Sequence, residues 1–417
     1  MSMPQAIAML GGLLVLAFAA NRLSSWTKMP DVVVLLIVGL LFGPVFKLLQ
    51  PSQFQTVTPI LGTLALILVL FEGGLELNLR ETLHQFPGSL LLATVAYGLS
   101  LMAVWLLASR ALHMPTRPAL LLGAVLGCTS STVVLPILQQ IAASEQVKVT
   151  LMLEASWGDV LAVLTVGALI NIPAGGIVGS LAQKVLLQIF ASVAVAALIG
   201  AAWVRLLPLL SEVRYWQVLT FSMVLLLYAA TESFGGNGLI AVLAFGLTLS
   251  NLRRLSGRLG ESLFGLGLPL ESQHQRILAF HSELSFLVRT FFFVLIGVVV
   301  ELQGLRGRIL LTVGIVAALC LARWVAVQAC RWSWKDFSPR DRELVTLLLP
   351  RGLITVVLAL QVIPVLGPDY SFLTSLAFAV VLVTNLLVIV AGIRSKPSQA
   401  FSYFTKLGPN EPRGAGL

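Results

Sequence analysis

Apolar runs separated by short polar stretches recur along the whole chain. Most of these runs are close to the length of about 20 residues that a helix needs to cross a hydrocarbon core of about 30 Å. The pattern therefore predicts an all-α membrane protein with thirteen transmembrane helices. The predicted segments are 6–22, 31–49, 57–77, 87–110, 117–141, 147–172, 182–210, 215–233, 236–251, 280–303, 308–331, 341–365 and 371–394.

Composition agrees with this pattern, because 58% of the residues are hydrophobic and only 11% are charged. A soluble domain carries about 25% charged residues. The net charge of +9 does not indicate nucleic-acid binding, since the basic residues lie at the ends of the predicted helices rather than in one patch. Most fall on one side of the membrane, which predicts an outside N-terminus and a cytoplasmic C-terminus in a bacterial inner membrane. The basic, glycine-rich stretch 252–279 is predicted to be a cytoplasmic loop.

The sequence also repeats itself over long distances. Thr132-Val133-Val134-Leu135 in the fifth segment recurs 223 residues later as Thr355-Val356-Val357-Leu358 in the twelfth. Leu68-Val69-Leu70 in the third resembles Phe293-Val294-Leu295 in the tenth, 225 residues later. Both matches are seven crossings apart, which is an odd number, so the two halves are predicted to be inverted repeats. Such repeats are typical of secondary transporters.

Both members of the repeated pair are polar where a spanning helix should be apolar. The fifth segment contains Gly127-Cys128-Thr129-Ser130-Ser131-Thr132, and the twelfth contains Pro350-Arg351-Gly352. An unwound helix is tolerated in a membrane only where its free backbone groups line a cavity or meet other protein. We therefore predict two crossed broken helices, with Arg351 offsetting the negative helix ends. Hydroxyl groups that bond their own helix backbone are the simpler alternative.

The sixth segment carries two carboxylates, Glu154 and Asp159, in the middle of an apolar run. A carboxylate near the bilayer centre costs at least about 2.5–3.5 kcal/mol on insertion scales, so it is expected to have a function. At 100° per residue, Ser156 shares a helix face with Asp159, whereas Glu154 points about 140° away. We predict that Asp159 faces an ion pathway and that Glu154 faces a neighbouring helix. A structural ion pair for each carboxylate is the alternative.

Two further charges lie inside apolar segments. Arg323 needs a carboxylate, because an unpaired buried cation is untenable, and Glu154 is the best available partner. Glu72 lies late in the third segment beside Gly73 and Gly74, so it is predicted either to contribute to the ion site or to pair at the membrane edge. The chain has no G-x-x-x-x-G-K-[ST] sequence and no H-E-x-x-H sequence, so we expect no enzyme, no cofactor and no metal beyond a transported cation.

These residues together resemble the monovalent cation:proton antiporter superfamily over about residues 5–395. The resemblance is carried by Phe71-Glu72-Gly73-Gly74-Leu75, by Thr129 to Thr132, by Glu154-Ala155-Ser156-Trp157-Gly158-Asp159, by Arg323 and by Pro350-Arg351-Gly352. It implies that Asp159 binds cation and proton in turn. It also implies that Thr129, Ser130, Ser156 and Glu72 help to bind the cation, and that Glu154 pairs with Arg323.

The resemblance also implies a division of the chain. Residues 1–80 and 178–305 are expected to form a dimer panel, and 81–177 and 306–395 a moving core, followed by a short cytoplasmic tail, 396–417. The expected partners are the lipid bilayer, a second copy of the chain in a homodimer, a proton and a monovalent cation. Ser130 and Gly158 differ from the sodium branch of the superfamily, so Na+ and K+ both remain open, with Li+ as a third candidate.

The function predicted from these features is exchange of Na+ or K+ for H+ by alternating access. A carboxylate such as Asp159 can be neutralised by a cation or by a proton but cannot hold both, so one species must return for each one exported. With Gly158 beside it, the exchange is predicted to be electroneutral. A gated cation channel and a membrane-embedded sensor without transport are the alternatives.

Overall fold

The protein is described here by a computed structural model. It describes residues 30–50, 57–76, 79–140, 143–170, 178–210, 214–263, 270–300, 308–333, 337–367 and 370–394, with residue 54 and parts of 4–23. Every regular element in these ranges is a helix, so the all-α prediction is confirmed for this part of the chain. The predicted segment 6–22 lies partly outside the described residues, and the tail 396–417 lies wholly outside them.

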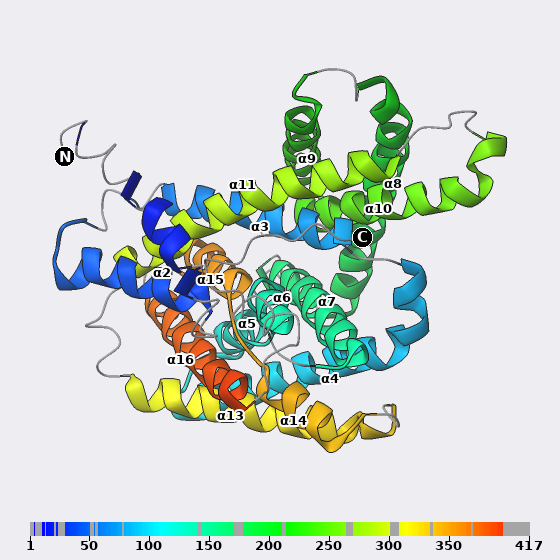
Figure 1. Ribbon diagram of the computed structural model, residues 1–417. Coiled ribbons are helices and arrows are strands. Elements are labelled where there is room, and N and C mark those ends of the chain that lie inside the picture. Colours follow the sequence, from blue (N-terminus) through cyan, green and yellow to red (C-terminus); the bar gives the residue numbers. More distant parts are fainter. Residues whose placement is uncertain are drawn as a thin grey trace, which may run out of the picture.

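Eight of the described helices are long and apolar enough to cross a membrane. Three shorter apolar helices accompany them, at Asp31–Val45, Gly238–Asn251 and Leu353–Ile363. In Figure 1, α8, α9 and α11 lie on one side of the molecule, α4, α13 and α14 on the other, and α5, α6 and α7 between them. The elements are α2 (Asp31–Leu40) with η1 (Leu41–Val45), α3 (Val57–Glu76), α4 (Leu79–Ala111), α5 (Thr116–Leu126), α6 (Ser131–Gln140), α7 (Glu145–Ile170), α8 (Val178–Leu210), α9 (Trp216–Ser233), α10 (Gly238–Leu263), α11 (Leu270–Val299), α13 (Ile309–Ala329) with η3 (Arg331–Ser333), α14 (Pro339–Leu347), α15 (Leu353–Leu366) and α16 (Phe372–Arg394).

Two of the predicted segments are interrupted helices. The helical backbone stops after Leu126 and resumes at Ser131, which separates α5 from α6. It stops again after Leu347 and resumes at Leu353, which separates α14 from α15. Proline contributes to the second interruption, because Pro350 disfavours helical backbone at the residue before it. The residues of both interruptions, 127–130 and 348–352, are buried, so their backbone groups need partners within the protein.

Glycines bring several pairs of the described helices into backbone contact, and in two of these pairs both helices contribute a glycine. In the contact of α2 with α11, a Cβ on Gly297 would lie 2.5 Å from the carbonyl oxygen of Leu36 and 2.8 Å from the Cα of Gly39. In the contact of α3 with α10, a Cβ on Gly246 would lie 2.6 Å from the carbonyl oxygen of Phe71 and 3.1 Å from the Cα of Gly74. Only glycine permits an approach this close.

The prediction of a long loop at 252–279 is wrong. Helix α10 continues to Leu263 and α11 begins at Leu270, while residues 264–269 lie outside the described part of the chain. The glycines and arginines of this stretch suggested a loop, but leucines recur there at 252, 255, 259 and 263. This spacing of three and four residues is that of an amphipathic helix.

Candidate functional site

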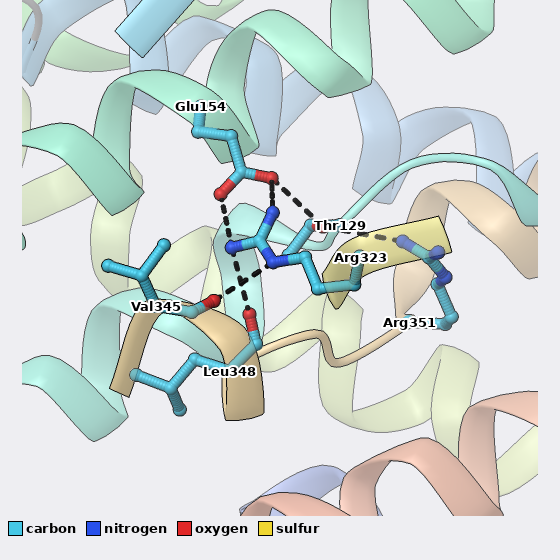
Figure 2. Close-up of polar contacts among 6 residues, drawn as sticks. All are labelled: Thr129, Glu154, Arg323, Val345, Leu348 and Arg351. Atoms are coloured by element: carbon cyan, nitrogen blue, oxygen red, sulfur yellow. Dashed lines mark hydrogen bonds and ion pairs between the residues drawn. The ribbon is translucent and has the colours of Figure 1, made fainter. Parts of the chain in front are cut away.

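A buried ion pair joins α7 to α13. Arg323 and Glu154 are each only 2% exposed. The Arg323 guanidinium binds the Glu154 carboxylate through both of its terminal nitrogens. Nη1 of Arg323 donates to Oε1 of Glu154, and Nη2 donates to Oε2 over 2.8 Å (Figure 2). Such two-pronged pairs fix the geometry of both side chains. The structure therefore brings together the two charges that the sequence suggested as partners.

Arg323 also satisfies the main chain where α14 ends. Its Nε donates to the carbonyl oxygen of Val345 over 2.9 Å, and its Nη2 donates to that of Leu348 over 3.4 Å (Figure 2). The last carbonyls of a helix lack partners within the helix and carry the negative end of its dipole. A guanidinium at this position stabilises the interruption, so Arg323 has a second task that its pairing with Glu154 did not predict.

The two interruptions touch each other. The backbone N–H of Ser130 donates to the carbonyl oxygen of Pro350 over 2.8 Å, which links the first interruption to the second. Gly352 lies directly against the Ser130 side chain, since a Cβ on Gly352 would come within 2.7 Å of the Cβ of Ser130. The hydroxyl of Ser130 is hydrogen-bonded to that of Thr132 over 2.8 Å. Backbone groups freed from one helix are thus satisfied by the other.

Asp159 lies beside this contact, on α7. Asp159 is only 2% exposed, and Oδ2 of its carboxylate accepts a hydrogen bond of 2.7 Å from the hydroxyl of Ser131. Its other oxygen, Oδ1, is buried without a hydrogen-bond partner among the described residues. A buried anionic oxygen without a partner is costly unless a proton or a cation neutralises it. Asp159 is therefore chemically suited to bind either one.

Thr129 connects the ion pair to a second buried arginine. The Thr129 hydroxyl donates to Oε1 of Glu154 over 3.2 Å and accepts from Nη1 of Arg351 over 3.3 Å (Figure 2). Arg351 is 2% exposed, and it lies within the second interruption. The backbone around it is held by α16, because its N–H donates to the Thr384 hydroxyl over 3.1 Å and its carbonyl accepts from Asn385 over 2.7 Å.

The residues predicted to bind the cation therefore contact different partners. Thr129 faces Glu154 and Arg351, and Ser130 faces Thr132, while the hydroxyl that reaches Asp159 is that of Ser131. Ser156 and Glu72 are half-buried, and within the described residues neither side chain forms a hydrogen bond or an ion pair.

Sequence reasoning missed the roles of Ser131, Thr384 and Asn385. Ser131 was part of the hydroxyl-rich run, but nothing in the sequence distinguished it from its neighbours. Thr384 and Asn385 offered a signal, because they form a polar pair inside the apolar run of α16. A polar pair in such a run requires partners, as do the open backbone groups at Arg351.

Known proteins resemble this chain over nearly its whole length. Residues 12–397 match the family described as "Sodium/hydrogen exchanger, transmembrane". The K(+)/H(+) antiporter NhaP of Alkalimonas amylolytica is 26% identical over 91% of this chain, which spans 64% of that relative's length. The Na(+)/H(+) antiporter 1 of Methanocaldococcus jannaschii is 23% identical over 99% of this chain and 98% of its own. The solved structure of the sodium proton antiporter MjNhaP1 from that organism at pH 8 matches with a TM-score of 0.76 and 20% identity, covering 98% of both chains.

The contact between the interruptions predicts that Gly352→Ala destabilises the protein. The added methyl group would overlap the Ser130 side chain, and overpacking of this kind costs about 1–3 kcal/mol. Gly158→Ala is the matched control, because a Cβ at Gly158 would lie 3.8 Å from its nearest neighbours, which is ordinary contact. The measurement is the apparent melting temperature of the purified protein in detergent. Equal melting temperatures for the two variants would contradict the tight contact.

The ion pair predicts that Glu154→Gln lowers both yield and thermal stability. The substitution strands the Arg323 charge in a buried site, at a cost of about 3–5 kcal/mol. Glu283→Gln, which changes an exposed glutamate of α11, should behave like the wild type. Expression level and melting temperature of the three proteins are compared side by side. A Glu154→Gln protein as abundant and as stable as the control would show that the pair does not support the fold.

Proposed function

Because the chain belongs to the family of transmembrane sodium/hydrogen exchangers, we propose that it is a secondary antiporter that exchanges Na+ or K+ for H+ by alternating access. The observation that carries the proposal is Asp159, a buried carboxylate with an open oxygen beside the contact between two interrupted helices. The relatives named as K(+)/H(+) and Na(+)/H(+) antiporters support the same activity.

Exchange follows from the cost of burying charge. An ionised Asp159 without a partner is expensive in a medium of low dielectric constant. A bound proton or a bound monovalent cation removes the net charge of the carboxylate, and the two compete for the same oxygens. If only the neutralised site can cross between the two sides of the membrane, each cation that leaves must be replaced by a proton. The protein then couples the two gradients without any other energy source.

The remaining polar residues divide into two groups. We assign Thr129, Ser130, Ser156 and Glu72 to cation binding together with Asp159, and Ser131 is added to this group because its hydroxyl already reaches the carboxylate. Glu154 and Arg323 are assigned a structural role, since each satisfies the other. Arg351 would compensate charge at the two interruptions through its contact with Thr129.

We further propose that the chain is built from two inverted repeats that cross at their broken helices. Gly74 and Gly297, which lie in the two glycine contacts, are 223 residues apart, the same spacing as Thr132 and Thr355. An inverted repeat would exchange α2 with α10 and α3 with α11, and so convert the contact of α2 with α11 into that of α3 with α10. Both contacts are present and both use glycine, which supports the repeat.

The same reasoning supports the proposed division into a panel and a core. The most extensive helix contacts join α2, α3, α8, α10 and α11 to one another, and α4, α5, α7 and α13 to one another. In this scheme the first group forms the panel of a homodimer and the second moves against it. We place the N-terminus outside and the C-terminus in the cytoplasm of a bacterial inner membrane, because most basic residues then lie on the inner side.

The proposed function predicts that Asp159→Asn abolishes exchange while the protein still folds. Asparagine keeps the shape of the side chain but removes the charge that both ligands need. The measurement is the change in internal pH of proteoliposomes after a jump in external Na+ or K+, and melting temperature verifies the fold. Normal exchange by Asp159→Asn would exclude Asp159 as the ion site. Current without proton movement in the wild type would instead indicate a channel.

Because Glu154 is already paired with Arg323, Asp159 is the carboxylate left to titrate beside the contact, which predicts exchange of one cation for one proton with no net charge moved. A net charge would couple to the membrane potential at about 2.3 kcal/mol per 100 mV. The test imposes a potassium–valinomycin potential on liposomes, with Na+ or Li+ as the exchanged ion, and follows the final internal pH. The pH gradient should not depend on voltage. A systematic dependence would require a second titrating group, and Glu72 is then the residue to substitute first.

A further inference from the structure

A cavity lies between the proposed core and the proposed panel, apart from the contact of the interruptions. It has a volume of about 220 Å3 and is enclosed by α7 and α15 on one side and by α8, α9 and the start of α10 on the other. This volume holds several water molecules. Its lining is partly polar, with Gln188, Tyr228, Glu232, Asn237 and Gln361 among the residues around it.

Five residues of α7 line the cavity, and three of them lie on the side of the helix that carries Asp159, while Leu164 and Ala168 lie on the opposite side. The three are Val163, Gly167 and Ile170, which lie 4, 8 and 11 positions beyond Asp159. At 100° per residue all three fall within about 80° of Asp159 around the helix axis. Val163 is only about 6 Å from Asp159 along that axis. The lining of the cavity therefore comes within about one helical turn of the buried carboxylate.

Glu232 gives the cavity its charge. It is the sole charged residue among the described residues of the lining, and its side chain is exposed. Its Oε1 accepts a hydrogen bond of 2.8 Å from the backbone N–H of Gly238, where α10 begins. This bond fixes the carboxylate, and the lone pairs that it leaves are available to a cation. A negative group at the mouth of a low-dielectric cavity raises the local concentration of cations.

We propose that this cavity is the vestibule through which hydrated monovalent cations reach Asp159 from the side of the α9–α10 turn, with Glu232 as the residue that attracts them. In the orientation proposed above, this is the outer side of the membrane. The inference rests on the proposed antiport, since it assigns one side of the exchange to a specific surface. Glu232 is a positioning residue for the cation and takes no part in the final binding at Asp159.

The experiment compares Glu232→Gln with the wild type in right-side-out and inside-out membrane vesicles. Glutamine keeps an oxygen that can accept from Gly238, so the turn should be preserved. The expected result is a three- to tenfold rise in the KM for the cation added on the side of the α9–α10 turn. The KM on the opposite side and the maximal rate should stay unchanged. The effect should shrink as inert salt is added, because the Debye length is only about 10 Å at 0.1 M.

Glu283→Gln is the control, because Glu283 is an exposed glutamate outside the cavity lining. An unchanged KM in Glu232→Gln, or an equal rise on both sides, would overturn the vestibule. If the wild type itself shows no exchange, the proposed function fails instead, so the two failures are distinguishable.

Thiol labelling tests the cavity without relying on transport by Glu232→Gln. A membrane-impermeant thiol reagent is applied from each side to Gln361→Cys and to Phe234→Cys, with the wild type measuring reaction of the native cysteines. Phe234 is 89% exposed in the α9–α10 turn, so its variant reports which side that turn faces. Labelling of both variants from the same side supports the vestibule. Labelling of Gln361→Cys only from the opposite side, or from neither, would overturn it.

Discussion

The arrangement of the site depends on Arg323, whose guanidinium donates hydrogen bonds both to a carboxylate side chain and to main-chain carbonyl groups at the end of a helix. The guanidinium binds the Glu154 carboxylate of α7 and the open carbonyls at the end of α14 at the same time. Without it, the end of α14 would leave carbonyl groups without partners in a membrane interior, where each costs several kcal/mol. Arg323 already pairs with the Glu154 carboxylate. Asp159 is therefore the buried carboxylate of α7 that has an oxygen without a hydrogen-bond partner among the described residues.

Much of this could be predicted from the sequence, because the bilayer imposes few solutions. Long apolar runs predict helices, and charges inside them predict partners or function. Glu154 and Arg323 could be matched for this reason, although they are 169 residues apart. The interruptions at Thr129–Ser130 and at Pro350–Gly352 were visible as polar sequence within apolar segments. The distinct directions of Glu154 and Asp159 followed from helical geometry alone.

The sequence did not predict contacts that depend on a fraction of a helical turn. Thr129, Ser130 and Ser131 are chemically similar neighbours, and only the path of the unwound backbone decides which hydroxyl meets Asp159 and which meets Glu154. The helical extension of α10 to Leu263 could not be predicted unambiguously, because glycines and arginines typical of a loop share this stretch with leucines at helical spacing. The vestibule near Glu232 required the tertiary structure, since five separate helices enclose it.

The two glycine contacts have a mechanical consequence. Where α2 meets α11 and α3 meets α10, main chain lies on main chain, and any sliding would drive Cα atoms over carbonyl oxygens. These two contacts therefore resist sliding of one helix along the other. The contacts between the proposed panel and the proposed core, those of α3 with α15, of α2 with α16 and of α8 with α7, are less extensive. In the proposed exchange cycle, the helices that these two contacts join would therefore move as one rigid unit, and displacement would occur where side chains rather than main chains separate the helices.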